Sequence, residues 1–239
     1  FALGKAPSGS ADPYALRRAG LGILRILQAR DDLGLSLQEI VDVALAVLPG
    51  GSLADGRDRD GLRVELLDFF RARLRSAWTG EGFGAGYVDA VLDAGFAAGS
   101  LTDVAARLVA VHGAAGSDGF DDLMVGFKRI ANIVRKAQEA GSVTVARIDV
   151  GAFVDPAEIQ LHARFVELAA TVSDAIERSD YPAALDAMAS LRGPLAEFFE
   201  QVMVLSEDPA LRSNRVALLS AIHGAFSRIA DFSRISTDR

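Results

Sequence analysis

Between residues 120 and 137, apolar side chains recur at the spacing of an α-helix. At about 100° per residue they fall within an arc of roughly 120°, the width of a core-facing stripe. The stripe consists of Phe120, Leu123, Met124, Phe127, Ile130, Ala131 and Val134. The opposite arc carries a group that we call the basic ridge: Lys128, Arg129, Asn132, Arg135 and Lys136. Because positions three, four, seven and eight apart share a helix face, this segment predicts a helix with one buried side and one basic, hydrogen-bonding side.

Helix-start signals occur at several other points of the chain. Ser36 and Glu39 have the spacing of a capping box. Asp155-Pro156-Ala157-Glu158 combines an N-cap, a first-turn proline and an acid three residues on, and Asp12-Pro13 and Asp208-Pro209 are similar starts. The helices predicted besides the ridge helix cover residues 13–30, 36–48, 59–78, 86–94, 100–111, 156–177, 181–191, 195–205 and 209–233.

Residues 113–119 (GAAGSDG) interrupt this helical pattern with three glycines and two capping residues. We therefore place a domain boundary there, with a helical domain or linker region over residues 1–116 and a second helical domain over residues 117–239. A β-branched run at residues 143–145 is compatible with a short extended piece in the loop after the ridge helix. The predicted fold class is all-α, with two helical domains.

The first predicted helix has an apolar face formed by Leu16, Ile23 and Leu27. Gly20 and Gly22 each cost about 1 kcal/mol of helix propensity relative to alanine, which suggests the close approach of another backbone. The arginines of this helix lie away from the Leu16 face. They are Arg17, Arg18 and Arg25, and both a solvated helix side and an RNA contact remain open for them.

Two further groups of charged residues favour structural roles. Residues 57–75 contain six arginines and four acids, a pattern that is typical of a solvated helix face with pairs four residues apart. In the last predicted helix, Asn214 and Arg215 fall toward the face that carries Leu218 and Ile222. Because an unpaired internal charge is very costly, a buried arginine needs a carboxylate or several carbonyls. We therefore expect Asn214 and Arg215 to stabilise the fold.

Composition limits the classes of function. The formal net charge is −7, yet residues 127–147 carry five basic residues and one acid, so the ridge differs in sign from the whole. The absence of cysteine excludes thiolate catalysis, iron–sulfur clusters and cysteine-ligated zinc. No apolar run reaches the roughly 18 to 20 residues that cross a membrane, and residues 1–10 do not resemble a signal peptide. We expect a cytoplasmic protein without membrane contact and, because it starts at Phe1, a piece of a longer one.

Motifs of covalent chemistry are missing from the sequence. There is no GxxxxGK[ST], no GxGxxG after a strand, no HExxH and no GxSxG. His112 has no second ligand at a metal spacing. Asp121 and Asp122 point about 100° apart on a helix and fit a charge role near its N-terminus. We therefore expect no catalytic residue and no metal site, and the residues alone leave one candidate RNA-contacting ridge.

Three segments resemble one known family. Residues 127–134 (FKRIANIV) resemble the K-R-[VI]-[SA]-N-I-[LV] helix of the β subunit of bacterial heterotetrameric glycyl-tRNA synthetase. Residues 12–18 (DPYALRR), followed by 21–26 (LGILRI), are similar to its D-P-[FY]-[AS]-L-R-R segment. Residues 198–204 (FFEQVMV) with Asp208, Arg212, Asn214 and Arg215 resemble its F-F-x-x-V-M-V … D-x-x-x-R-x-N-R pattern. The sequence departs from the family at Phe127, which is often polar, and at Ala131, which is often serine.

The resemblance implies a function that the residues alone do not give. In this family a separate α subunit forms glycyl-adenylate with ATP and Mg²⁺, the β subunit binds tRNA, and the two assemble as α2β2. The C-terminal part of β resembles the all-helical anticodon-binding domain of the DALR type, to which residues 117–239 are similar. The resemblance thus implies part of a glycine–tRNA ligase that needs tRNA-Gly and the α subunit as partners, binds no DNA and holds no cofactor itself.

The implied RNA contacts follow from the motifs. Glycine codons share their first two bases, so a protein specific for tRNA-Gly can recognise the two cytosines common to all glycine anticodons. The basic side chains of the ridge would meet phosphates or acceptor edges of bases, and Asn132 could hydrogen-bond a base. Arg17 and Arg18 are further candidate tRNA contacts, and Arg212, Asn214 and Arg215 are either structural or secondary tRNA contacts. The alternative function is a helical interaction scaffold, in which the ridge docks the catalytic subunit or another acidic partner.

Overall fold

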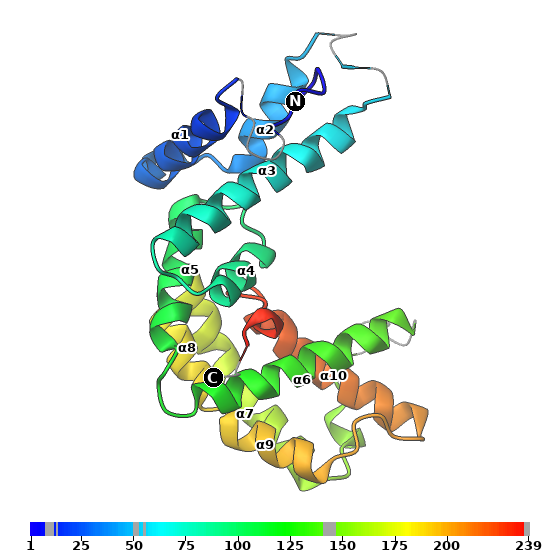
Figure 1. Cartoon of the computed structure of the whole chain (residues 1–239). Helices are drawn as coiled ribbons and strands as arrows, with labels where there is room; N and C mark the ends of the chain where they lie inside the picture. Colours follow the sequence, from blue (N-terminus) through cyan, green and yellow to red (C-terminus); the bar gives the residue numbers. More distant parts are fainter. Residues whose placement is uncertain (8–11, 13, 50–52, 55, 141–146, 237–239) are drawn as a thin grey trace. The chain divides into compact units, whose positions relative to one another are not determined.

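A computed structural model describes residues 1–7, 12, 14–49, 53–54, 56–140 and 147–236 (Figure 1). These residues form ten α-helices and three short 3-10 helices, and they contain no strand. The chain divides into two compact units, Phe1–Leu108 and Val109–Arg239. The predicted all-α fold class is confirmed, and the run at residues 143–145 lies outside the described residues. The division falls within a continuous helix, α5 (Leu101–Ala114), just before the glycine-rich turn at which we placed the domain boundary.

The first unit is built around one long helix, α3 (Arg59–Gly80). It contacts α1 (Leu16–Ala29), α2 (Leu37–Ala46) and α4 (Ala85–Asp93), and a short 3-10 turn, η1 (Asp31–Leu33), follows α1. Its buried residues are Leu62, Phe70, Leu74 and Trp78. The predicted capping box is confirmed at the start of α2, where Ser36 accepts from the N–H of Glu39 and the Glu39 carboxylate accepts from the N–H of Ser36.

Our prediction for the first helix was partly wrong. The helix begins at Leu16, because Asp12 lies ahead of it and accepts from the N–H groups of Leu16 (2.8 Å) and Arg17 (3.0 Å). Its buried face is formed by Gly20, Leu24 and Leu27, whereas the predicted core residue Ile23 is 37% exposed. The close neighbour expected at Gly20 is a side chain and not a backbone, since a Cβ at Gly20 would lie 2.7 Å from Cε1 of Phe69. Gly22 has no neighbour of this kind.

Three arginines of α3 are paired with acids of neighbouring helices, which corrects the prediction of pairs within one helix. Arg63 binds Asp42 of α2, with Nε 2.5 Å from Oδ1. Arg75 binds Asp89 of α4 at 2.9 Å, and Arg71 binds Asp93 at 2.5 Å. Because each carboxylate lies on a neighbouring helix, these pairs attach α2 and α4 to α3.

The second unit is a bundle that follows the end of α5. Its helices are α6 (Phe120–Glu139), α7 (Pro156–Glu177), α8 (Tyr181–Ala189), α9 (Arg192–Gln201) and α10 (Pro209–Phe226), with 3-10 turns η2 (Val150–Ala152) and η3 (Phe232–Arg234). Helix α6 contacts α10, α9 and η3, while α7 contacts α8, α9 and α10. Figure 1 shows α6 and α10 side by side. The predicted start of α7 is confirmed, including the capping box between Asp155 and Glu158.

Several predicted helix boundaries in this unit were wrong, and α9 spans Arg192–Gln201 rather than residues 195–205. Gly193 and Pro194 do not precede a helix but lie in the first turn of α9, where a proline is tolerated because first-turn N–H groups have no partner within the helix. The last helix ends at Phe226 rather than near residue 233. The chain then turns, which brings Phe232 of η3 to 5.6 Å from Phe127 of α6, measured between ring centroids.

Candidate RNA-binding site

Helix α6 presents the basic ridge because its opposite face is fixed in the core of the second unit. The buried residues are Phe120, Leu123, Met124, Phe127, Ile130, Val134 and Ala137. Ala131, expected in the stripe, is only half-buried, and Ala137 extends the stripe by one turn. The Phe127 ring packs edge-on against Phe226 of α10, with centroids 5.1 Å apart. The phenylalanine that departs from the family pattern therefore anchors the helix and leaves its polar side outward.

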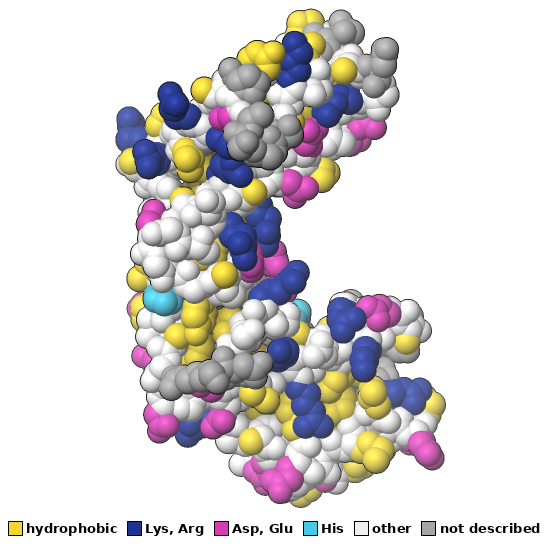
Figure 2. All heavy atoms as spheres, viewed as in Figure 1, with side chains coloured by type: hydrophobic (Ala, Val, Ile, Leu, Met, Phe, Trp, Pro, Cys, Tyr) yellow, Lys and Arg dark blue, Asp and Glu magenta, His cyan; other side chains and the backbone are white. Residues whose placement is uncertain are grey.

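All five ridge residues are exposed. In Figure 2, Lys and Arg side chains gather over α6 and the helices beside it. Arg135 is held along the helix by Glu139 (Nη1 to Oε1, 3.0 Å) and by the side-chain oxygen of Asn132 (3.4 Å). Within the described part of the chain, no ion pair neutralises Lys128, Arg129 or Lys136. The ridge therefore offers three uncompensated cations and one amide whose N–H groups point to no partner within the described residues.

A pocket of about 290 Å³ opens on one side of α6, between it and α9. The Arg129 guanidinium lies over the ring of Phe199, 4.2 Å from its centroid. The helices approach closely here because Gly126 has no side chain: a Cβ would lie 2.6 Å from Cδ2 of Leu195. Charged residues of both signs complete the lining, namely Asp122, Arg192 and Glu200. This pocket thus combines an aromatic surface with hydrogen-bond donors and acceptors.

A second pocket, of about 460 Å³, lies between the C-terminal part of α6 and the start of α10. It brings Lys136 of the ridge together with Arg212, over an apolar lining that includes Leu205 and Val216. Arg212 is half-buried and donates from Nη1 to the carbonyl of Ser206 at 2.7 Å, which orients its guanidinium. Two cations over an apolar surface are suited to a phosphate with its attached sugar or base.

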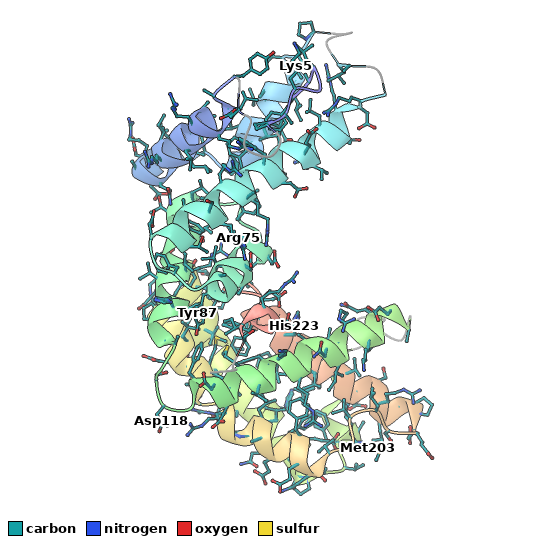
Figure 3. All side chains as sticks on the ribbon, in the orientation of Figure 1. Lys5, Arg75, Tyr87, Asp118, Met203 and His223 are labelled. Atoms are coloured by element: carbon teal, nitrogen blue, oxygen red, sulfur yellow. The ribbon has the colours of Figure 1, made fainter. Side chains whose placement is uncertain are left out.

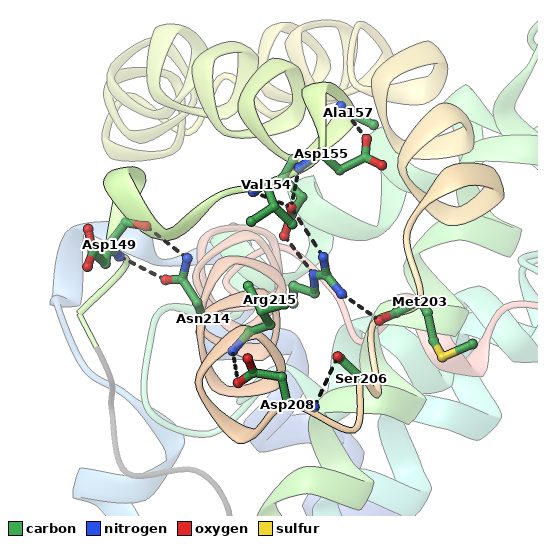
Figure 4. Close-up of polar contacts among 11 residues, drawn as sticks. Asp149, Val154, Asp155, Ala157, Met203, Ser206, Asp208, Asn214 and Arg215 are labelled. Atoms are coloured by element: carbon green, nitrogen blue, oxygen red, sulfur yellow. Dashed lines mark hydrogen bonds and ion pairs between the residues drawn. The ribbon is translucent and has the colours of Figure 1, made fainter.

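Arg215 points away from these pockets into the core and meets a buried carboxylate (Figure 4). Its Nε donates to Oε1 of Glu158 at 2.7 Å and its Nη2 to Oε2 at 3.3 Å. Its Nη1 donates at 2.9 Å to the carbonyl of Met203, which lies in the α9–α10 connection (Figure 3). Arg215 is 6% exposed and Glu158 is 1% exposed. The pair fastens α10, the start of α7 and the α9–α10 connection to one another.

The environment of Glu158 keeps it ionised. Burial by itself raises the pKa of the Glu158 carboxyl, but the hydrogen bonds from Arg215 and from the N–H groups of Asp155 and Val154, together with the charge of Arg215, lower that pKa below its ordinary value overall. Those two N–H bonds measure 2.8 Å and 3.0 Å. Glu158 therefore both caps α7 and supplies the carboxylate that a buried arginine requires.

Asn214 binds backbone rather than facing solvent. Its side-chain oxygen accepts from the N–H of Asp149 and its amide nitrogen donates to the carbonyl of Asp149, both at 2.8 Å. This two-bond contact holds the segment before α7 against α10. Arg17 and Arg18, by contrast, lie on α1 of the first unit, where Arg18 is exposed and Arg17 is half-buried. The candidate site of the second unit therefore consists of the ridge and the two pockets beside it.

Three residues of the first pocket, Phe199, Arg192 and Glu200, were not predicted from the sequence. Phe199 follows Phe198, which is fully buried, whereas Phe199 is only half-buried. Adjacent helix positions point about 100° apart, so two consecutive phenylalanines on an amphipathic helix could have indicated that one of them reaches the surface. No comparable signal marked Arg192, whose guanidinium lies against Gly119 at the start of α6.

The described residues also bear on two other kinds of site, a metal-binding cluster and a membrane-spanning helix. In the described ranges, no group of three or more histidine or acidic side chains is placed to hold a metal ion. Among the described helices, none is long and apolar enough to cross a membrane.

Comparisons with known proteins match each of the two units to a family model. Residues 1–93 match the family model of the glycyl-tRNA synthetase beta subunit, and residues 123–232 match the DALR anticodon binding domain. The glycine–tRNA ligase beta subunit of Anaeromyxobacter dehalogenans (strain 2CP-C) is 42% identical over 99% of this chain and 32% of its own length. The beta subunits of Geotalea uraniireducens and Myxococcus xanthus are 40% and 39% identical, with 33% of each covered. The chain spans about a third of the length of these curated relatives.

Proposed function

Because the chain belongs to the glycyl-tRNA synthetase beta subunit family and its second unit is a DALR anticodon binding domain, we propose that α6 and its two flanking pockets bind the anticodon arm of tRNA-Gly. The observation that carries this proposal is the convergence on α6 of uncompensated cations and of two pockets lined by them. RNA-binding sites in single-stranded loops need such cations for the phosphates and such concave, partly aromatic surfaces for the splayed bases.

The phosphate contacts are assigned to side chains that have no competing ion pair in the described residues. Lys128 is exposed near the middle of α6, and Lys136 and Arg212 meet at the second pocket. Arg135 is engaged by Glu139 and contributes less charge, although it orients the side-chain amide of Asn132. That amide can then donate to an acceptor on a base edge. Arg17 and Arg18 are proposed to contact another part of the same tRNA.

Within the whole protein, this chain would supply tRNA recognition rather than chemistry. We propose that it forms part of a glycine–tRNA ligase in the cytoplasm, whose α subunit activates glycine with ATP and Mg²⁺. The high share of acids in this chain does not oppose tRNA binding, because a net charge of −7 coexists with a locally basic ridge. Affinity for RNA depends on the cations that reach the phosphates, not on the total charge.

The proposal is tested by the salt dependence of binding to a tRNA-Gly transcript. Lys128→Ala/Lys136→Ala in the full chain should weaken binding and make the log–log salt slope shallower by about 0.7 for each lost phosphate contact. The matched control is Arg164→Ala/Arg178→Ala, which removes two cations from α7 and its C-cap and should leave the slope unchanged.

An unchanged slope in the ridge variant would refute the assignment. A second titration uses a transcript whose anticodon cytosines are both replaced by uridine. It distinguishes recognition of the anticodon bases from binding to the RNA backbone alone. Equal affinity for the two transcripts would favour backbone contact or the alternative function, docking of the ridge on an acidic partner protein.

A further inference from the structure

We propose that the pocket between α6 and α9 takes a single cytosine base of the bound RNA, stacked against the Arg129–Phe199 pair and selected by Glu200. This inference rests on the proposed function of α6 and assigns one of its two pockets. The other pocket is lined by two cations and no acid, so it is suited to a phosphate instead. Of these two pockets, only the first has a lining that combines an aromatic ring with charged hydrogen-bond donors and acceptors.

The stacking surface is already assembled. Phe199 is half-buried and rests edge-on against Phe198, whose ring is fully buried, with centroids 5.5 Å apart. The Arg129 guanidinium lies over Phe199 at 4.2 Å. Unstacked RNA bases lie on aromatic rings and on guanidinium planes, and here the Phe199 ring supports the Arg129 guanidinium from beneath. A base entering the pocket thus meets a flat surface without rearrangement of the core.

The direction of the two helices places the charged groups along the pocket. Gly119 meets Arg192, Gly126 meets Leu195, and Arg129 meets Phe199, so α6 and α9 advance in the same direction. Arg192 and Asp122 therefore lie toward the N-terminal end of the pocket. Glu200, the neighbour of Phe199, lies toward the end that carries Arg129.

The carboxylate at that end matches the amino group on the edge of a cytosine. An ionised carboxylate only accepts hydrogen bonds. Cytosine presents an exocyclic amino group that donates beside a ring nitrogen and a carbonyl that accept, and glutamate is a known acceptor for this amino group. Glu200 can accept from the amino group of a base that is stacked on the Arg129 guanidinium. Uracil places a carbonyl where cytosine has the amino group, so it would face the Glu200 carboxylate with like polarity.

Within the described residues, Glu200 has neither an ion pair nor a hydrogen bond that would compete with a base. Its carboxylate is exposed at the pocket rim. Adenine also carries an amino group beside a ring acceptor, and a pocket of about 290 Å³ has room for either ring system. The choice of cytosine therefore rests on the proposed function, because all glycine anticodons share two cytosines.

The test compares the full chain with variants on four tRNA-Gly transcripts: unmodified, each anticodon cytosine separately replaced by uridine, and the discriminating cytosine replaced by adenosine. The wild-type chain should bind the unmodified transcript about 10-fold or more tightly than one of the single uridine transcripts. Glu200→Gln, whose amide can donate as well as accept, should reduce that ratio to near one while leaving the ratio at the other cytosine unchanged. Phe199→Leu should weaken binding of the unmodified transcript about 10-fold.

Glu197→Gln is the matched control, because it makes the same change on the same helix at a residue outside the pocket. Its base preference should equal that of the wild type. If Glu200→Gln retains the full preference for cytosine at both positions, the pocket assignment is overturned. Equal affinity for cytosine and adenosine transcripts would overturn the choice of a pyrimidine.

These failures differ from a failure of the proposed function. In that case the wild-type chain shows no preference between tRNA-Gly and the uridine transcripts, or the ridge variant leaves the salt slope unchanged. If the ridge variant lowers the slope while Glu200→Gln and Phe199→Leu have no effect on base preference, α6 binds the RNA and the base lies elsewhere.

Discussion

Replacing Arg215 with alanine should destabilise the second unit by about 3 kcal/mol. Removal of one partner from a buried ion pair typically costs about 3 to 5 kcal/mol, because the other charge is left uncompensated. In this chain the carboxylate left behind, Glu158, is 1% exposed but still accepts from the N–H groups of Val154 and Asp155. These two remaining bonds place the expected loss at the lower end of the range. The carbonyl of Met203 also loses its donor.

Urea unfolding of the full chain measures this loss. At a slope of about 2 kcal/mol per molar, 3 kcal/mol shifts the midpoint down by about 1.5 M. Far-ultraviolet circular dichroism follows helices of both units, whereas fluorescence of Trp78, the single tryptophan of the sequence, follows the first. Arg215→Ala should therefore lower the urea midpoint of the second unit, as followed by circular dichroism, and leave the midpoint reported by Trp78 fluorescence unchanged.

A matched exposed arginine and a double variant complete the experiment. Arg178→Ala removes an exposed cation at the end of α7 and should leave the midpoint unchanged. Arg215→Met/Glu158→Gln removes both charges and should recover part of the loss, since no buried charge remains. If Arg215→Ala has the same urea midpoint as the wild type, the Arg215–Glu158 ion pair does not stabilise the second unit and the argument is refuted.

The same pair makes stability depend on pH in a defined direction. The folded-state pKa of Glu158 is lowered from its ordinary value, so its contribution is fully present above the unfolded-state pKa of about 4.3 and is lost as pH falls through the folded-state pKa. The difference in midpoint between the wild type and Glu158→Gln should accordingly be largest near neutral pH and shrink on acidification. A difference that stays constant down to acid unfolding would contradict an ionised Glu158.

Three other variants test the packing around the candidate site. Gly126→Val should destabilise the second unit by about 1 to 3 kcal/mol in urea, because even a Cβ at this position lies 2.6 Å from the buried Leu195; an unchanged midpoint would show that α6 and α9 are not closely packed. Gly113→Ala, by contrast, meets no atom within 4 Å in α5 and should stabilise by about 0.5 to 1 kcal/mol. Asn214→Leu should speed hydrogen exchange at the N–H of Asp149, whose acceptor is the Asn214 oxygen, and protection equal to the wild type would exclude that bond.

Helix existence and most starts were predictable from the sequence because caps are local. The side chain of Ser36 or Asp155 reaches a backbone N–H only two or three residues away, so the signal lies within one turn. The same reasoning misplaces the start of α9, because Gly193 and Pro194 are typical of a break between helices. A first turn tolerates proline, and only the packing of Leu195 against Gly126 reveals that the helix has already begun.

The buried faces were less predictable than the helices. In α1 the angular count alone selected Ile23, but the neighbour that decides the face is Phe69, which fills the space over Gly20. For Arg215 the requirement for a buried carboxylate follows from the cost of an internal charge, yet its partner lies 57 residues away at Glu158. Pairings over such separations depend on tertiary packing, which no periodicity in the sequence encodes.

Helices α3 and α6 differ in how their basic residues are paired within the fold. Helix α3 is richer in arginine, but Arg63, Arg71 and Arg75 are each neutralised by an aspartate from a neighbouring helix. Their charges are satisfied within the fold, and binding a phosphate there would require breaking an ion pair.

On α6 the geometry is opposite, since Lys128 and Lys136 have no acid within ion-pair distance among the described residues, and Arg129 contacts a ring instead of a carboxylate. A phosphate reaching α6 releases counterions rather than displacing an aspartate, which is the condition under which basic residues contribute to RNA affinity. We therefore propose α6 as a tRNA-binding surface because these three cations lack acidic partners within the described residues, and not because of their number.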